Sequence, residues 1–161
     1  MKKFLVTTLL FLIGGLSLTS QAGELSIYNC DISTDMTVEQ FKKKFSVRKD
    51  PLDMYTEHNR PKNITDQQLM VINKKYYRFE NYGMWVFFSM EGQLDTLRFE
   101  KPYRGTVGGV HIGDSMEELL KVKGMPESND SNGIIYRSSG TYVNYKTMNG
   151  LVYQAFTNHC D

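Results

Sequence analysis

The feature that most constrains the fold of this chain is a short capped helix pattern that occurs twice. In the stretch Gly109–Pro126, Ser115 and Glu118 have the spacing of a capping box, in which each side chain accepts a hydrogen bond from the backbone N–H of the other residue. Gly124 and Pro126 follow the helix, because glycine adopts the left-handed conformation of a helix end and proline cannot continue a helix. The pattern therefore predicts a short, well-delimited helix.

A second, less complete copy lies nearer the N-terminus. Thr37 and Gln40 form another capping box, and Phe41 and Phe45 follow one helical turn apart. Landmarks beyond the helix also recur in the same order, as the pairs Tyr77 and Tyr136, Gly83 and Gly140, Val86 and Val143, and Gly92 and Gly150. We therefore expect two tandem units, in which Phe41 and Leu119 occupy equivalent buried positions.

Each unit is expected to fold as a helix followed by an antiparallel meander, at about residues 34–100 and 110–157. The predicted strands are residues 76–80, 84–90 and 93–100 in the first unit and 134–138, 141–147 and 151–157 in the second. Asn149-Gly150 favours a type I′ hairpin turn. The expected fold class is α+β, with two tandem helix-plus-antiparallel-meander units that form one sheet with helices packed on one face.

Two segments have no place in the repeat. Residues 52–75 form an insertion whose polar stretch Tyr55–Pro61 resembles the long loops that often carry function. The alternative is a solvated excursion with one short element around Gln67–Ile72. Residues 101–109 have the proline and glycine content of a linker.

Residues 1–22 have the pattern of a secretory signal peptide. Lys2 and Lys3 precede an apolar run, and small residues end at a cleavage site after Ala22. A retained membrane anchor is the alternative, but Gly14-Gly15 interrupts the run. We expect a single domain over residues 23–161, located in the periplasm or secreted, without stable membrane insertion.

The charge of the chain gives no sign of a nucleic-acid or membrane partner. Without Lys2 and Lys3, the basic residues are one fewer than the 18 acidic residues. The only basic cluster, Lys42–Lys44 with Arg48 and Lys49, is better explained as a solvated helix face than as a phosphate site.

Cys30 and Cys160 are the two cysteines of the chain. In an oxidising compartment they predict one disulfide that joins the ends of the mature protein. The alternative is a catalytic thiol at Cys160 beside His159, but a disulfide accounts for both cysteines.

The sequence carries no recognisable catalytic or metal-binding motif. His58, His111 and His159 are scattered, and His111 with Asp114 would bind a metal only if further ligands converged on a helix start. We therefore expect a protein that is not an enzyme, without metal or cofactor.

Aromatic residues are the outstanding feature of the composition, with 10 Tyr, 9 Phe and 1 Trp. Strand alternation places Val86 and Phe88 on a core face. The opposite face should carry large aromatic residues among polar groups, which is typical of protein-binding surfaces. The candidate partner-binding residues are Trp85, Phe87, Tyr142, Lys146, Arg78 and Tyr55. The alternative is that Trp85 and Phe87 are packed under the insertion.

The run Ile112-Gly-Asp-Ser115, followed by Glu117, Leu119, Leu120 and Gly124-Met-Pro126 ahead of a meander, resembles the SmpA/OmlA and β-lactamase-inhibitor-protein group. The resemblance implies two tandem units, as in the β-lactamase inhibitors, and a function in protein binding. The first unit lacks the Ile-Gly-Asp and Gly-x-Pro signatures. No lipoprotein cysteine follows the signal, which favours an inhibitor over an outer-membrane lipoprotein.

The sequence therefore predicts a soluble periplasmic domain that binds another protein. In its sharpest form, the chain is an inhibitor or immunity protein that blocks a toxin or a cell-wall-acting enzyme. The alternatives are an accessory protein in envelope or outer-membrane assembly, and an enzyme whose site is assembled from loops.

Overall fold

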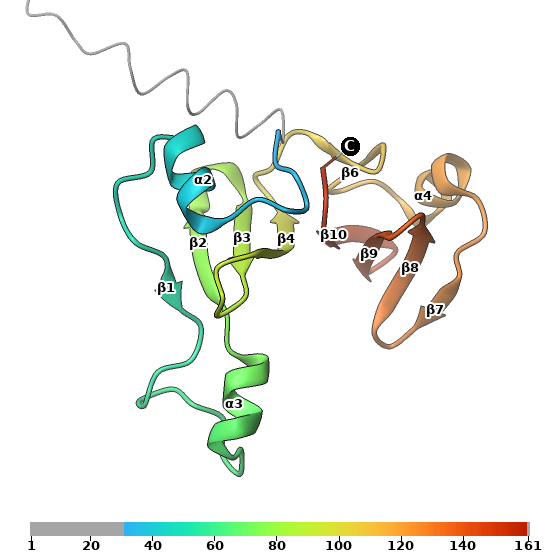
Figure 1. The fold of residues 1–161 in the computed structure, drawn as a ribbon. Helices are drawn as coiled ribbons and strands as arrows, with labels where there is room; N and C mark the ends of the chain where they lie inside the picture. The colour runs from blue at the N-terminus through green and yellow to red at the C-terminus, as the bar shows by residue number, and fades with distance from the viewer. Residues whose placement is uncertain (1–30, 161) are drawn as a thin grey trace, which may run out of the picture.

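The computed structural model describes residues 31–160, which form one large antiparallel sheet with helices beside it (Figure 1). The eight strands lie in the order β1-β2-β3-β4-β10-β9-β8-β7. Their bounds are β1 Leu52–Asp53, β2 Lys75–Phe79, β3 Met84–Phe88, β4 Leu94–Glu100, β7 Ser128–Asp130, β8 Gly133–Ser138, β9 Thr141–Met148 and β10 Leu151–Thr157. The helices are α2 Val38–Lys44, α3 Asp66–Ile72 and α4 Met116–Lys123, with a 3-10 turn η1 at Glu80–Tyr82. The predicted α+β class with one main sheet is confirmed.

The sheet consists of two meanders joined side by side. Strands β2, β3 and β4 form the first meander, strands β8, β9 and β10 form the second, and β4 pairs with β10 between them. Each meander is preceded in the chain by a helix, α2 or α4. From α2 and α4 onward, the order of elements is the same in both halves apart from α3 and η1, which occur only in the first half.

The contacts at the start of the two helices also correspond. Both capping boxes are formed, at Thr37 and at Ser115, and each capping residue makes a β-bridge to the first residue after a hairpin turn, Gln93 or Leu151. The next backbone N–H donates to the glycine carbonyl of that turn at 2.9 Å in both halves. Phe41 and Leu119, at matching positions, are both fully buried. These contacts support the duplication, which stays a prediction.

The core lies between the sheet and the helices α2 and α4. The ring of Phe41 on α2 is 5.3 Å from that of Tyr77 on β2 and 5.6 Å from that of Phe88 on β3. In the second half, Leu119 on α4 and Tyr145 on β9 are both fully buried. Both helices therefore pack on the same face of the sheet, as expected.

Residues 101–109 contribute two side chains to the core, and the linker interpretation is wrong. Tyr103 and Val107 are buried, and β5 (Thr106–Val107) pairs with β6 (Val110–His111) just beyond the segment. The Tyr145 hydroxyl donates to the carbonyl oxygen of Val107 at 2.6 Å. Proline and glycine indicate turns here, but the two large apolar residues between them are buried, as those of a solvated linker are not.

The insertion contains one helix at the place expected for a short element. Helix α3 has its own capping box at Thr65 and extends away from the end of the sheet (Figure 1). Ahead of it, β1 adds two residues to the sheet edge, with Leu52 opposite Tyr76. The insertion thus starts and ends beside the sheet.

The predicted signal peptide and Cys30 lie outside the described residues, and so does the proposed cleavage site. Residues 31–160 contain no helix that is long and apolar enough to cross a membrane.

Candidate binding site

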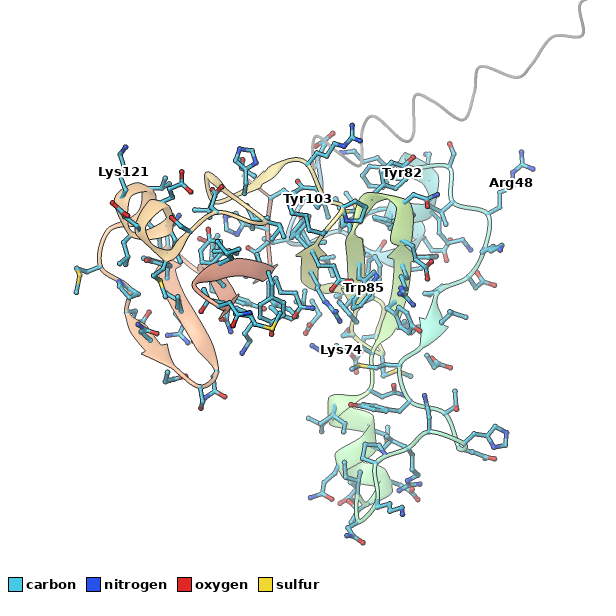
Figure 2. The ribbon with its side chains drawn as sticks, turned by 180° about the vertical axis from the view of Figure 1, so that it is seen from behind. Arg48, Lys74, Tyr82, Trp85, Tyr103 and Lys121 are labelled. Atoms are coloured by element: carbon cyan, nitrogen blue, oxygen red, sulfur yellow. The ribbon has the colours of Figure 1, made fainter. Side chains whose placement is uncertain are left out.

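The candidate site is the face of the sheet that α2 and α4 leave uncovered, which we call the open face. Along β3, Met84, Val86 and Phe88 are buried against the core, whereas Trp85 and Phe87 between them are half-buried. The strand register carries this alternation across the sheet. The open face comprises Tyr76, Arg78, Trp85, Phe87, Thr96, Arg98, Glu100, Tyr142, Asn144, Lys146, Gln154 and Phe156. In Figure 2, which shows the molecule from behind, Trp85 lies on this side.

Trp85 lies between two arginine side chains from the neighbouring strands. Arg78 on β2 and Arg98 on β4 are its direct cross-strand partners. The Cζ atom of Arg98 is 3.3 Å from the centre of the indole ring, and that of Arg78 is 5.0 Å from it. Guanidinium groups at these distances are attracted by the negative face of the ring. The three side chains therefore form one stacked row across three strands.

Glu100 holds one end of this row in place. Its Oε2 accepts hydrogen bonds from Arg98 Nη2 at 2.6 Å and from Gln154 Nε2 at 2.8 Å. Burial raises the pKa of Glu100, but the hydrogen bonds from Gln154 and Arg98 and the charge of Arg98 outweigh burial, so the pKa lies below 4.5. Glu100 is therefore ionised at neutral pH and orients Arg98.

Two hollows lie side by side on the open face. The larger, which we call the aromatic hollow, has a volume of about 400 Å³, and the smaller, the arginine hollow, about 220 Å³. Met54 and Phe87 line both. The aromatic hollow is completed by Ile72, Lys74, Thr96, Tyr142, Asn144, Lys146 and Phe156, and the arginine hollow by Tyr76, Arg78, Trp85 and Arg98. Volumes of this size accommodate single side chains of a partner.

Three basic side chains on or beside the open face are held by carboxylates of the same chain. Lys74 pairs with Asp95, Arg98 with Glu100, and Arg78 with Glu80 at 3.1 Å. Lys146 differs, because its Nζ donates to the backbone carbonyl oxygen of Asn132.

The structure brings five of the six predicted site residues together. Trp85, Phe87, Tyr142, Lys146 and Arg78 all belong to the open face.

Tyr55 is the exception. It lies in the insertion, where both its backbone N–H and its carbonyl oxygen bond the Asn73 side chain, at 2.9 and 3.2 Å, and it lines neither hollow. Its neighbour Met54 lines both hollows instead.

Sequence reasoning missed several residues of the hollows. Arg98 and Phe156 could have been found by extending the strand alternation to β4 and β10, which form the centre of the sheet. Met54 and Ile72 carry no such signal, because they lie in the insertion. Their position beside Phe87 means that the insertion does flank part of the face, whereas Trp85 is covered by arginines.

No cluster of three or more His, Cys, Asp or Glu side chains suited to a metal ion occurs among residues 31–160. Asp114 Oδ2 accepts from the backbone N–H of His111 at 2.8 Å, a local turn contact at the start of α4.

Comparisons with known proteins add no relative: no family model, curated protein or solved structure matches the chain.

Proposed function

We propose that this chain is an exported, periplasmic protein that binds another protein through the open face and blocks its activity, as an inhibitor or immunity protein does. The observation that carries the proposal is the stacked row of Arg78, Trp85 and Arg98 beside the aromatic hollow. Tryptophan, tyrosine and arginine are the residues that most often dominate the energy of protein interfaces.

Contacts among the side chains of the open face support this role. Trp85 lies against two guanidinium groups, and the Tyr142 hydroxyl lies 3.3 Å from Thr96 Oγ1. A surface whose side chains are already ordered loses less conformational entropy on association. Side chains held by such contacts therefore suit the binding of a partner.

Site-specific photo-crosslinking in the producing cell tests the proposal. A benzophenone amino acid replaces Tyr142 on the open face or, as the control, Met125, which is 89% exposed near α4. We expect a covalent adduct with one protein from position 142 and none from position 125. Adducts from both positions, or from position 125 alone, would contradict a site on the open face.

The purified partner then separates binding from inhibition. Trp85→Ala should weaken its binding by about 2 kcal/mol or more, because truncation removes an anchor from the centre of the contact. The partner's own activity should fall when wild-type protein is added in equal amount. Binding without loss of activity would contradict the inhibitor role and point to an accessory role in the envelope.

A further inference from the structure

The two hollows of the open face are lined by basic but not by acidic side chains. Lys74 and Lys146 line the aromatic hollow, and Arg78 and Arg98 line the arginine hollow; the described lining of either contains no carboxylate. All four cations thus lie where a partner's side chain would enter, although Asp95 pairs with Lys74 and Glu100 with Arg98.

A hollow elsewhere on the molecule, beside the start of α2, has the opposite charge. Its lining includes Glu39, Asp50, Asp53 and Glu91 against a single basic residue, Lys75. A further hollow, lined by Lys123, Arg137 and His159 among others, also has no carboxylate. The cations of the two open-face hollows do not reflect an excess of basic residues in the whole chain, in which 19 Lys and Arg face 18 Asp and Glu.

Lys146 is the cation best placed to receive a partner's carboxylate. Its ammonium group bonds a carbonyl oxygen, and the ion pairs within 4.0 Å among residues 31–160 do not include Lys146. Hydrogen bonds from the backbone of Asn132 and the side chain of Ser128 lower the pKa of Asp130, and the charge of Lys146 adds to this effect. Arg78 is the next, because its pair with Glu80 is more than half exposed on both sides and can be exchanged at little cost. Both groups therefore keep donors for a negatively charged partner.

The floor between the basic residues is apolar. Met54 and Ile72 reach the aromatic hollow from the insertion, each about one third exposed, and Phe87 and Phe156 reach it from the sheet. Such a floor suits an apolar side chain, because its burial there removes apolar surface from water, which a bare phosphate or sulfate cannot do.

We propose that the partner is a protein whose binding segment is acidic, with an apolar side chain that fills the aromatic hollow and a neighbouring carboxylate that binds Lys146. This inference rests on the proposed function and names the chemistry of its partner. Cations above an apolar floor attract such a segment during encounter and orient it after contact.

Selection from a library of displayed random 12-residue peptides tests the proposal. The full chain is the target, and each selected peptide is then synthesised with a fluorescent label. We expect selected peptides to carry a Leu, Ile or aromatic residue within two positions of Asp or Glu. Replacing those acidic residues with their amides should weaken binding at least fivefold.

Matched variants locate the contact on the protein. Met54→Asp and Lys146→Glu each place a negative charge at the aromatic hollow and should weaken peptide binding about tenfold or more. Met125→Asp and Lys121→Glu make the same changes on and beside α4 and should leave binding unchanged. Circular dichroism tests whether each variant is folded. If Met54→Asp is unfolded, the peptide affinity of Lys146→Glu alone decides whether the aromatic hollow is the contact.

Three results would overturn the proposal of an acidic partner segment. The first is the selection of peptides without acidic residues, and the second is an equal effect of the test and control variants on peptide binding. The third is that Lys146→Glu abolishes binding to vesicles with 30% phosphatidylglycerol but leaves peptide binding unchanged. A protein adduct at position 142 that persists in Lys146→Glu would also overturn it but would leave the proposed function standing. Absence of any adduct at position 142 contradicts the proposed function itself.

Discussion

Trp85 shows how a single side chain can be neither core nor free surface. Its neighbours along β3, Met84 and Val86, are fully buried, but Trp85 faces the other side of the sheet and is half-buried. What covers it is mainly the planar guanidinium of Arg98, 3.3 Å from the ring centre. A partner that binds the open face, as proposed, would therefore meet the edge of an Arg-Trp-Arg stack and the donors of the two arginines, and not a bare indole ring.

The carboxylate of Glu100 should make the free energy of unfolding depend on pH. Because its folded-state pKa lies below the ordinary value of 4.5, the ionised group stabilises the folded protein above that value. This contribution to stability begins to fall when the pH drops below 4.5, the ordinary pKa of the unfolded chain. It is lost as the pH passes through the lower pKa that Glu100 has in the folded protein.

We therefore expect Glu100→Gln to lower the free energy of unfolding at pH 7, with a difference from wild type that shrinks as the pH falls below 4.5. Urea unfolding at a series of pH values measures this difference. Glu117→Gln, an exposed change on α4, controls for the loss of one negative charge. A difference that is constant over the whole range would show that the ionised form of Glu100 has no special role.

At the scale of elements, the second hairpin and η1 illustrate two different demands on glycine. Asn149 and Gly150 both have positive φ, of 53° and 76°, as a type I′ turn requires. Gly83, which ends η1, has φ of 61°, and its carbonyl oxygen accepts from the backbone N–H of Glu100 at 2.9 Å. The first position requires only a backbone conformation, whereas the second also brings two strand ends into close contact.

Substitution of Gly83 should separate these two demands. A Cβ atom at this position would lie 2.0 Å from the Glu100 carbonyl oxygen, while at Gly140, with φ of 84°, it would meet nothing within 4 Å. Gly140→Ala should cost about 1 kcal/mol for the left-handed backbone alone, and Gly83→Ala about 2 kcal/mol or more beyond that. Chemical denaturation of both variants measures the difference. Equal losses would mean that β4 moves away from Gly83 without penalty.

Local signals in the sequence predicted most helices, strands and turns, because capping boxes and turn dipeptides depend only on residues close together in the chain. The capping boxes at Thr37 and Ser115 and the Asn149-Gly150 turn are all formed as expected. Burial of Tyr103 was not predictable from proline and glycine content, because it depends on the turn after β4, which places the ring of Tyr103 4.6 Å from that of Phe99.

The candidate site divides in the same manner. The two faces of β3 follow from alternation within one strand, and so Trp85 and Phe87 were placed correctly. The neighbours of these residues follow from strand pairing, which brings Phe156 on β10 opposite Arg98 on β4, 58 positions earlier in the chain by numbering. The positions of Met54 and Ile72 depend on the path of the insertion, which has no counterpart in the second half of the chain. The sequence therefore predicted Tyr55 as the binding residue of the insertion instead of these two.

At the scale of the whole molecule, the pairing of β4 with β10 makes one sheet of two meanders. Four residue pairs, from Gln154 opposite Glu100 to Thr157 opposite Leu97, join the halves. Ile32, near the start of the described chain, is buried in the same core cluster against which Cys160 packs near the end. Both ends of the fold therefore contribute to one core, and a covalent link between them would restrain the entire domain.

The final prediction is the disulfide between Cys30 and Cys160, of which Cys30 lies outside the described residues. Protein isolated from the periplasm should contain no thiol that reacts with iodoacetamide until a reductant is added under denaturing conditions. Closing a loop of about 130 residues is worth about 5 kcal/mol in the chain-entropy model, an upper figure because the unfolded chain keeps some structure. Reduction, or the double substitution Cys30→Ser with Cys160→Ser, should therefore lower the free energy of unfolding by several kcal/mol and make it depend more steeply on urea, because the unlinked unfolded chain exposes more surface. Two reactive thiols in the freshly isolated protein would show that the ends are not linked, and an unchanged unfolding midpoint after reduction would show that the link does not restrain the unfolded chain.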